Sequence, residues 1–153
     1  MTRVAIIASR GTLDWAYPPF ILASTAAALG FEVKMFFTFY GLQLLKRELD
    51  LQVSALGNPA MPMPMTVPVV AQTLPGMQQF MTQLMKNKLK EKNVASVEEL
   101  RALTREAGAT LIACQMTMDL FDFRREDFIE EIEVGGAASF LEFAAQSQIT
   151  LFI

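Results

Sequence analysis

The first part of the chain constrains the fold most, because two almost wholly apolar stretches lie on either side of a helical pattern. Strands are predicted over residues 3–8 (RVAIIA) and 31–37 (FEVKMFF), and the nearly unbroken apolar run of the first is typical of a strand buried on both faces. Residues 14–29 between them predict a helix that ends at Gly30. A strand, a helix and a strand within about 35 residues predict a right-handed βαβ unit with parallel strands.

Strand and helix patterns continue to alternate through the rest of the chain. They predict helices or helical turns over residues 42–49, 74–92, 96–108, 117–123, 124–132 and 134–146, and strands over residues 52–56, 109–113 and 148–153. In the first helix, Pro18 and Pro19 are tolerable in the first turn but would break the helix later. The alternation predicts an α/β fold, a flavodoxin-like three-layer α/β/α sandwich with about five mostly parallel strands.

The length of 153 residues fits a single domain with a sizeable core. We predict one domain over residues 1–153, with an insertion at about 58–93. The first half of the insertion, residues 59–68 (PAMPMPMTVP), is expected to be extended, because its alternating prolines prevent a helix. Its methionines either pack under a neighbouring element or subunit, which we favour, or form a soft, adaptable lining of a site.

The second half of the insertion is the amphipathic helix predicted over residues 74–92. Four lysines crowd its C-terminal end, at positions 86, 88, 90 and 92. We favour a helix that packs on the core and keeps this end solvated, where the lysines match the helix dipole. The alternatives are a membrane-surface helix or a docking site for an acidic carrier, and we do not expect peripheral membrane contact.

The composition excludes several classes of chemistry. The chain has no histidine, which excludes Cys–His nucleophilic catalysis within one chain and argues strongly against a zinc hydrolase. We predict no metal and no cofactor. The 13 basic and 16 acidic residues are nearly balanced, which argues against nucleic-acid binding.

The composition also indicates where such a chain would work. A single cysteine cannot form an internal disulfide, and neither a signal peptide nor a transmembrane segment is recognisable. We therefore expect a cytoplasmic protein. The apolar share of 52% suggests that some apolar surface is buried between subunits of a homo-oligomer.

The single cysteine lies where chemistry is most plausible in a parallel sheet. Residues 110–119 (TLIACQMTMD) predict a buried strand that ends at Cys114, followed by a helix. Open α/β sheets bind ligands at such strand ends, and a helix N-terminus lowers the pKa of a thiol. Cys114 is therefore the candidate nucleophile. The alternative is an inert core residue, since free cysteine is among the most buried residue types.

Two groups of residues are candidates for binding a substrate beside this thiol. The backbone amides of Gln115, Met116 and Thr117 follow the cysteine at the start of the predicted helix. Gly11 and Thr12 follow the first strand and would line the same crevice. With a single glycine, this loop matches neither the dinucleotide fingerprint nor a P-loop, so nucleotide binding is the weakest hypothesis.

Several motifs occur together in a familiar order. They are residues 8–19 (ASRGTLDWAYPP), 36–42 (FFTFYGL), 57–65 (GNPAMPMPM), 113–119 (ACQMTMD) and 133–136 (EVGG). Together they resemble the DsrE/DsrF-like family of sulfur-transfer proteins, in particular the DsrE-like branch associated with TusA and heterodisulfide-reductase-like sulfur oxidation. The resemblance covers nearly the whole chain, and we add Asn58 to the candidate substrate-binding residues.

The resemblance implies a cytoplasmic homo-oligomer, a trimer or tetramer, that carries sulfane sulfur on Cys114 as a persulfide or, in some members, a thiosulfonate. The partners it implies are a TusA-like carrier and a rhodanese. The chain lacks the second cysteine of some members, so a relay between two thiols within one chain is impossible. It also reads LFDF at residues 120–123, where related sequences often turn through a glycine.

Two functional hypotheses therefore compete. The first is a sulfur carrier or sulfurtransferase that exchanges sulfur with a partner thiol, which requires no acid or base because exchange runs through thiolates. The second is a non-catalytic oligomeric adaptor or regulator in which Cys114 is inert. A depressed thiol pKa would favour the first.

Overall fold

Five parallel strands form a single sheet at the centre of the computed structural model, which describes residues 1–54 and 69–153. The strands lie in the order β4-β3-β2-β1-β5. Their bounds are Arg3–Ala8 for β1, Glu32–Phe37 for β2, Thr110–Cys114 for β3, Glu133–Gly135 for β4 and Ile149–Phe152 for β5. The predicted α/β class with about five mostly parallel strands is confirmed, and every strand pair is parallel.

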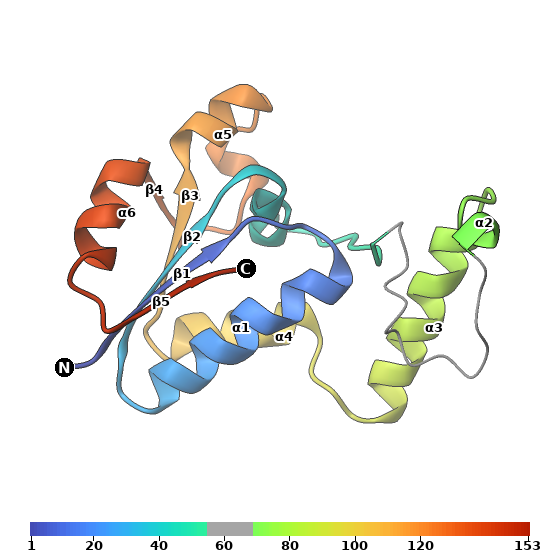
Figure 1. Cartoon of the computed structure of the whole chain (residues 1–153), viewed down its shortest axis with the longest axis horizontal. Coiled ribbons are helices and arrows are strands. Elements are labelled where there is room, and N and C mark those ends of the chain that lie inside the picture. Colours follow the sequence, from blue (N-terminus) through green and yellow to red (C-terminus); the bar gives the residue numbers. More distant parts are fainter. Residues whose placement is uncertain (55–68) are drawn as a thin grey trace.

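Helices cover both faces of the sheet, which gives three layers (Figure 1). Helices α1 (Leu13–Ala28) and α4 (Val97–Glu106) pack side by side on one face, and α6 (Ala137–Ala144) lies on the other. Ser96 begins α4 with a reciprocal capping box, in which its hydroxyl accepts from Glu99 N–H and the Glu99 carboxylate accepts from Ser96 N–H. This reciprocal cap fixes the start of α4 at Val97.

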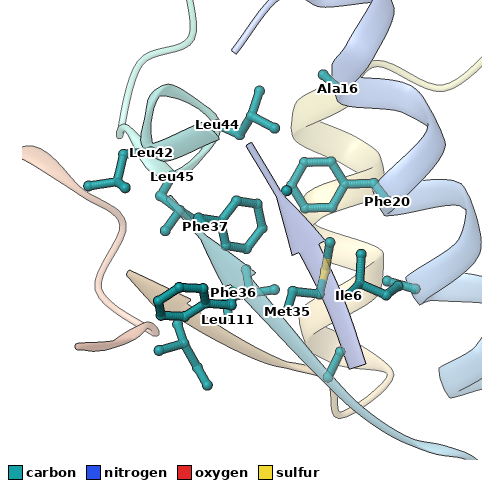
Figure 2. Packing of buried hydrophobic residues seen from close by; sticks show 14 of the residues in the cluster. Ile6, Ala16, Phe20, Met35, Phe36, Phe37, Leu42, Leu44, Leu45 and Leu111 are labelled. Atoms are coloured by element: carbon teal, nitrogen blue, oxygen red, sulfur yellow. The ribbon is translucent and has the colours of Figure 1, made fainter. Parts of the chain in front are cut away.

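Strand β2 sends alternate side chains into the two halves of the core. Phe37 lies 5.9 Å from Phe20 of α1 between ring centroids, whereas Phe36 stacks on Phe140 of α6 at 5.0 Å. Figure 2 shows Phe36 and Phe37 pointing to opposite faces of the sheet. A strand between two helical layers is apolar on both faces, which is why residues 35–37 (MFF) lack polar alternation, whereas Glu32 and Lys34 alternate with apolar residues at the start of the strand.

Pro18 and Pro19 lie in the interior of α1, within the helix that the sequence predicted over residues 14–29. The helix begins at Leu13, and the two prolines leave the carbonyls of Asp14 and Trp15 without their i+4 donors. The helix continues through them because its inner face is buried on the sheet from Leu13 to the end of the helix. Tertiary packing thus outweighs the local cost of about 3 kcal/mol for each proline.

The segment after β2 differs from the prediction of a helix over residues 42–49. It forms a 3₁₀ helix, η1 (Phe39–Leu45), that starts immediately after the strand. Gly41 allows this tight start, since a Cβ at that position would lie 2.1 Å from the carbonyl oxygen of Ala8. The helix predicted over 124–132 is likewise reduced to the short η2 (Arg125–Asp127).

One of the five predicted strands, over residues 52–56, is not part of the sheet. Residues 52–54 are not a strand, and the remainder of the predicted strand lies outside the described residues. Backbone groups of this segment bond to helices instead, with Leu13 N–H donating to Gln52 O and Val53 N–H to Thr82 Oγ1. The sheet still has five strands because β4 forms where no strand was predicted. It includes Val134 and Gly135, which were predicted to begin a helix.

The helical part of the predicted insertion projects beside the sheet as α2 (Val69–Gln72) and α3 (Met77–Glu91) (Figure 1). Only Met81 and Thr82 of α3 are buried, so the helix packs on the core along a narrow stripe. The Met/Pro run over 59–68 lies outside the described residues, and the division into one domain with an insertion stays a prediction. No helix among the described residues is long and apolar enough to span a membrane.

We predict that Gly41→Ala destabilises the protein by about 3 kcal/mol, because the new methyl group meets backbone rather than a mobile side chain. Gly136→Ala is the matched control, since nothing lies within 4 Å of a Cβ built there. It should cost less than about 1 kcal/mol, as expected for a change at a helix N-cap. Urea unfolding of both variants measures the difference, and equal losses would contradict the close approach.

Candidate functional site

Cys114 is the last residue of β3 and the N-cap of α5 (Gln115–Leu120), a helix predicted to start at residue 117. Its side chain is 4% exposed. On one side the register places it opposite Gly135 of β4. On the other side Phe37 of β2 pairs with Ala113 of β3. The residue after each of these two, Thr38 and Cys114, therefore lies at the same edge of the sheet. The thiol thus lies at the carboxyl edge of three neighbouring strands.

Two threonine hydroxyls and two backbone amides surround the sulfur. The donors that lower the pKa of the Cys114 thiol are the hydroxyl and N–H of Thr117, the hydroxyl of Thr38 and the N–H of Met116, although the side chain does not cap α5 with a regular hydrogen bond. The two hydroxyl oxygens lie 3.2 Å apart, and Phe39 N–H donates to Thr117 Oγ1 at 3.1 Å. Because Thr117 Oγ1 already accepts that bond, its own proton is free to point at sulfur.

These contacts set the pKa of the thiol. Burial by itself raises the pKa of Cys114, because it penalises the charged form. The hydrogen bonds from Thr117, Thr38 and Met116 favour the thiolate and outweigh burial, so the net pKa lies below its ordinary value. Cys114 is therefore a buried thiol whose surroundings favour its reactive form.

The structure separates the residues that the sequence placed together. The backbone amides of Met116 and Thr117 are among the groups that lower the pKa of the thiol. The Gln115 side chain is exposed and donates to Asp119 at 2.7 Å, and its amide is not among the groups bonded to sulfur. Asn58 lies outside the described residues.

Gly11 and Thr12 do not reach the thiol, in contrast to the prediction that they line its crevice. They follow β1, which is separated from β3 by β2, and strand spacing puts about 10 Å between the two strand ends. They line a separate cavity of about 430 Å³ with Arg10, Trp15, Tyr40, Gln43 and Ser54. A Cβ on Gly11 would lie 2.2 Å from Tyr40 O, so this loop packs against η1.

Thr38 and Gly135 are residues of the site that the sequence reasoning missed. Thr38 has a recognisable signal, because it is the first polar residue after a strand that neighbours the cysteine strand. Gly135 has none, since its segment was predicted to be helical. A Cβ at Gly135 would lie 3.2 Å from Ile112 Cγ2, so this neighbour of the cysteine has little room for a side chain.

An exposed apolar rim surrounds the buried sulfur. Tyr40 stacks on Phe121 at 6.0 Å between ring centroids, and Phe39 meets the edge of Phe121 at 6.2 Å. Met116 and Leu120 lie one turn apart on α5 and are 63% and 57% exposed. We call these five residues, Phe39, Tyr40, Met116, Leu120 and Phe121, the aromatic collar.

The described residues contain no group of three or more His, Cys, Asp or Glu side chains arranged to hold a metal ion. A metal-bound nucleophile therefore has no candidate ligand set in this part of the chain. The site offers one sulfur, its hydrogen-bond donors and an apolar approach. Such a group can attack and release another sulfur atom through its thiolate.

Comparison with known proteins identifies the family of the chain. The model of the DsrE/DsrF/DrsH-like family matches residues 1–152. The chain belongs to this family. The Allochromatium vinosum protein named sulfur carrier protein DsrE2 is 61% identical over 155 residues, covering 99% of this chain and 98% of that relative. The Bacillus subtilis protein YrkE, described as uncharacterized, is 30% identical and the match covers 99% of this chain and 96% of YrkE.

Solved structures show the same DsrE-like fold at low sequence identity. The YchN protein from Escherichia coli superimposes with a TM-score of 0.61 at 9% identity, over 100% of both chains. MTH1491 from Methanobacterium thermoautotrophicum, a protein of unknown function, gives a TM-score of 0.53 at 11% identity, again over 100% of both chains. At these identities the likeness concerns the fold alone.

We predict that alkylation of Cys114 by iodoacetamide, followed against pH, gives a thiol pKa below the ordinary value. Thr117→Val removes one donor to the thiolate and should raise that pKa, and Thr38→Val should do the same. The control is Thr104→Val, because Thr104 is fully buried on α4 and bonds only to Leu100 O. If the three variants titrate alike, the hydroxyls do not set the pKa.

Proposed function

We propose that this protein is a sulfur carrier that holds sulfane sulfur as a persulfide on Cys114 and exchanges it with the thiol of another protein. The observation that carries the proposal is the thiol itself, whose hydrogen bonds lower its pKa against the effect of burial. Membership of the DsrE/DsrF/DrsH-like family and the 61% identity to a protein named sulfur carrier protein DsrE2 support it.

The exchange consists of two thiolate attacks. The Cys114 thiolate first attacks the outer sulfur of a donor persulfide, so that a bond forms between the two sulfurs while the donor's S–S bond breaks and its thiolate leaves. An acceptor thiolate then attacks the outer sulfur on Cys114, and the Cys114 thiolate leaves. The number of S–S bonds is unchanged at each step, so no external oxidant or reductant is needed.

The residues around Cys114 assist both steps in the same way. Thr117, Thr38 and the amide of Met116 stabilise negative charge on sulfur, which favours the attacking thiolate in the first step and the leaving thiolate in the second. No acid or base takes part, which fits a chain without histidine. Hydrogen bonds to charged groups contribute about 1.5–3 kcal/mol each, so every donor matters.

The partner must be another molecule, because the chain has no second cysteine. We propose a TusA-like carrier as the exchange partner and a rhodanese as a further one, within a cytoplasmic homo-oligomer of this chain. The alternative role is a non-catalytic adaptor with an inert cysteine, and the 4% exposure of Cys114 is the observation in its favour. Such a thiol would react with iodoacetamide only after unfolding.

Mass spectrometry after incubation with polysulfide tests the proposal directly. We expect the intact protein to gain the mass of one sulfur atom, to lose it on treatment with dithiothreitol, and to gain nothing as Cys114→Ser. Thr117→Val should load about tenfold more slowly, because about 1.4 kcal/mol of thiolate stabilisation is lost. An unmodified Cys114 under conditions that load a TusA-like control would refute the sulfur carrier and favour the adaptor.

A further inference from the structure

The surface around Cys114 is mainly apolar, which restricts the kind of protein segment that can bind there. The sulfur is almost fully buried, whereas Tyr40 and Met116 of the collar are 66% and 63% exposed. The three collar rings contact one another, Tyr40 and Phe121 by stacking and Phe39 edge-on to both, so contacts within the chain hold this part of the rim together. Contiguous exposed apolar groups of this kind mark interaction surfaces.

The charged side chains beside the collar are the carboxylates of Asp119 and Asp122 and, at its margin, the cations of Lys46 and Arg10. Within residues 115–123 the only charged side chains are Asp119 and Asp122, and both are exposed. Residues 39–45 of η1, on the other side of the thiol, carry no charge. The next residue, Lys46, places its Nζ 4.8 Å from the centre of the Phe123 ring. The rim is therefore apolar with two carboxylates and no cation within these two segments.

We propose that the aromatic collar with Asp119 and Asp122 is the docking surface for a cysteine-bearing segment whose flanking residues are apolar and basic. This inference rests on the proposed sulfur exchange and adds the chemistry by which the partner is recognised. The apolar residues of the segment cover the collar rings. Its lysines or arginines lie against the two carboxylates and steer the encounter.

The depth of the sulfur adds a constraint on shape. Cys114 is 4% exposed, so an acceptor thiol reaches it only if neighbouring side chains give way. A flat protein surface is poorly suited to bring its own cysteine into such a narrow opening. A cysteine on an extended or mobile segment can enter it, with its neighbours resting on the rim.

Two short synthetic peptides test the charge preference. Each carries one cysteine flanked by leucines, with lysines in one peptide and glutamates in the other. The protein is loaded with polysulfide and desalted, and sulfur transfer to each peptide is followed by mass spectrometry. Rates are normalised to transfer from cysteine persulfide to the same peptide, which corrects for the intrinsic reactivity of each peptide thiol.

We expect the lysine peptide to react about tenfold faster than the glutamate peptide at low salt, and the difference to shrink as salt screens the charges. Asp119→Lys with Asp122→Lys should reverse the preference. The matched control is Glu106→Lys with Glu142→Lys, which makes the same charge change at exposed positions on α4 and α6. It should leave the preference unchanged, and transfer to 2-mercaptoethanol should differ little among the variants.

The apolar part of the surface has its own readout. Phe121→Ser with Leu120→Ser should slow transfer to both peptides by a larger factor than it slows transfer to 2-mercaptoethanol. Equal normalised rates for the two peptides, or a preference that survives charge reversal, overturn the proposal. Sedimentation that shows the collar variants dissociating an oligomer also overturns it, because the collar would then be buried between copies of this chain.

Binding of serine versions of the peptides separates this inference from the proposed function. Fluorescence polarisation with these peptides measures docking without any sulfur transfer. Tighter binding of the lysine peptide, lost in the Asp119→Lys, Asp122→Lys variant, supports the docking surface even if no persulfide forms on Cys114. Normal persulfide loading without any peptide preference refutes the docking surface and leaves the sulfur carrier intact.

Discussion

The parallel pairing of β2 with β3 is the contact on which the rest of the site depends. Phe37 pairs with Ala113, so the two strands end in register and Thr38 leaves the sheet beside Cys114. The turn that follows brings Phe39 N–H onto Thr117 Oγ1, and this bond ties η1 to α5 across the thiol. The same pairing holds Phe36 and Phe37 in the two halves of the core. One strand register therefore fixes both the core packing and the donors near the sulfur. A slip by one residue would turn the side chains of the strand to the opposite faces and separate Thr38 from Cys114.

Burial and hydrogen bonding act on Cys114 in opposite directions, and hydrogen bonding wins. A thiol at 4% exposure in an apolar core would be protonated and inert. Donors from the loop after β2 and from the start of α5 change that result, because a thiolate in a water-poor site gains more from each fixed donor than it would in solvent. The site thus combines protection of a reactive sulfur with stabilisation of its charged form. We propose that the aromatic collar with Asp119 and Asp122 selects among approaching thiols.

The residues show which parts of this arrangement were predictable. The first two strands, the cysteine strand and the last strand were predicted from their mainly apolar segments, of which the first and the cysteine strand are the most continuous. Cys114 as candidate and the amides of Met116 and Thr117 were proposed from their position after such a run. The helix over residues 14–29 was also predicted, and it continues through Pro18 and Pro19 because packing on the sheet overrides a local cost. The strand at Glu133–Gly135 was missed, since three residues beside two glycines carry almost no periodic signal.

The sequence alone determined the α/β class, the order of the main elements and the single thiol on which any sulfur chemistry must run. These follow from local patterns, from the absence of histidine and from the count of one cysteine. Only the tertiary structure decided which residues meet at that thiol. Thr38 and Thr117 are 79 positions apart and come within hydrogen-bond distance through strand pairing, whereas Gly11 and Thr12, predicted as neighbours of the thiol, are separated from it by a strand. Local pattern reports the element to which a residue belongs, but strand order and register, which depend on contacts between distant segments, determine its neighbours.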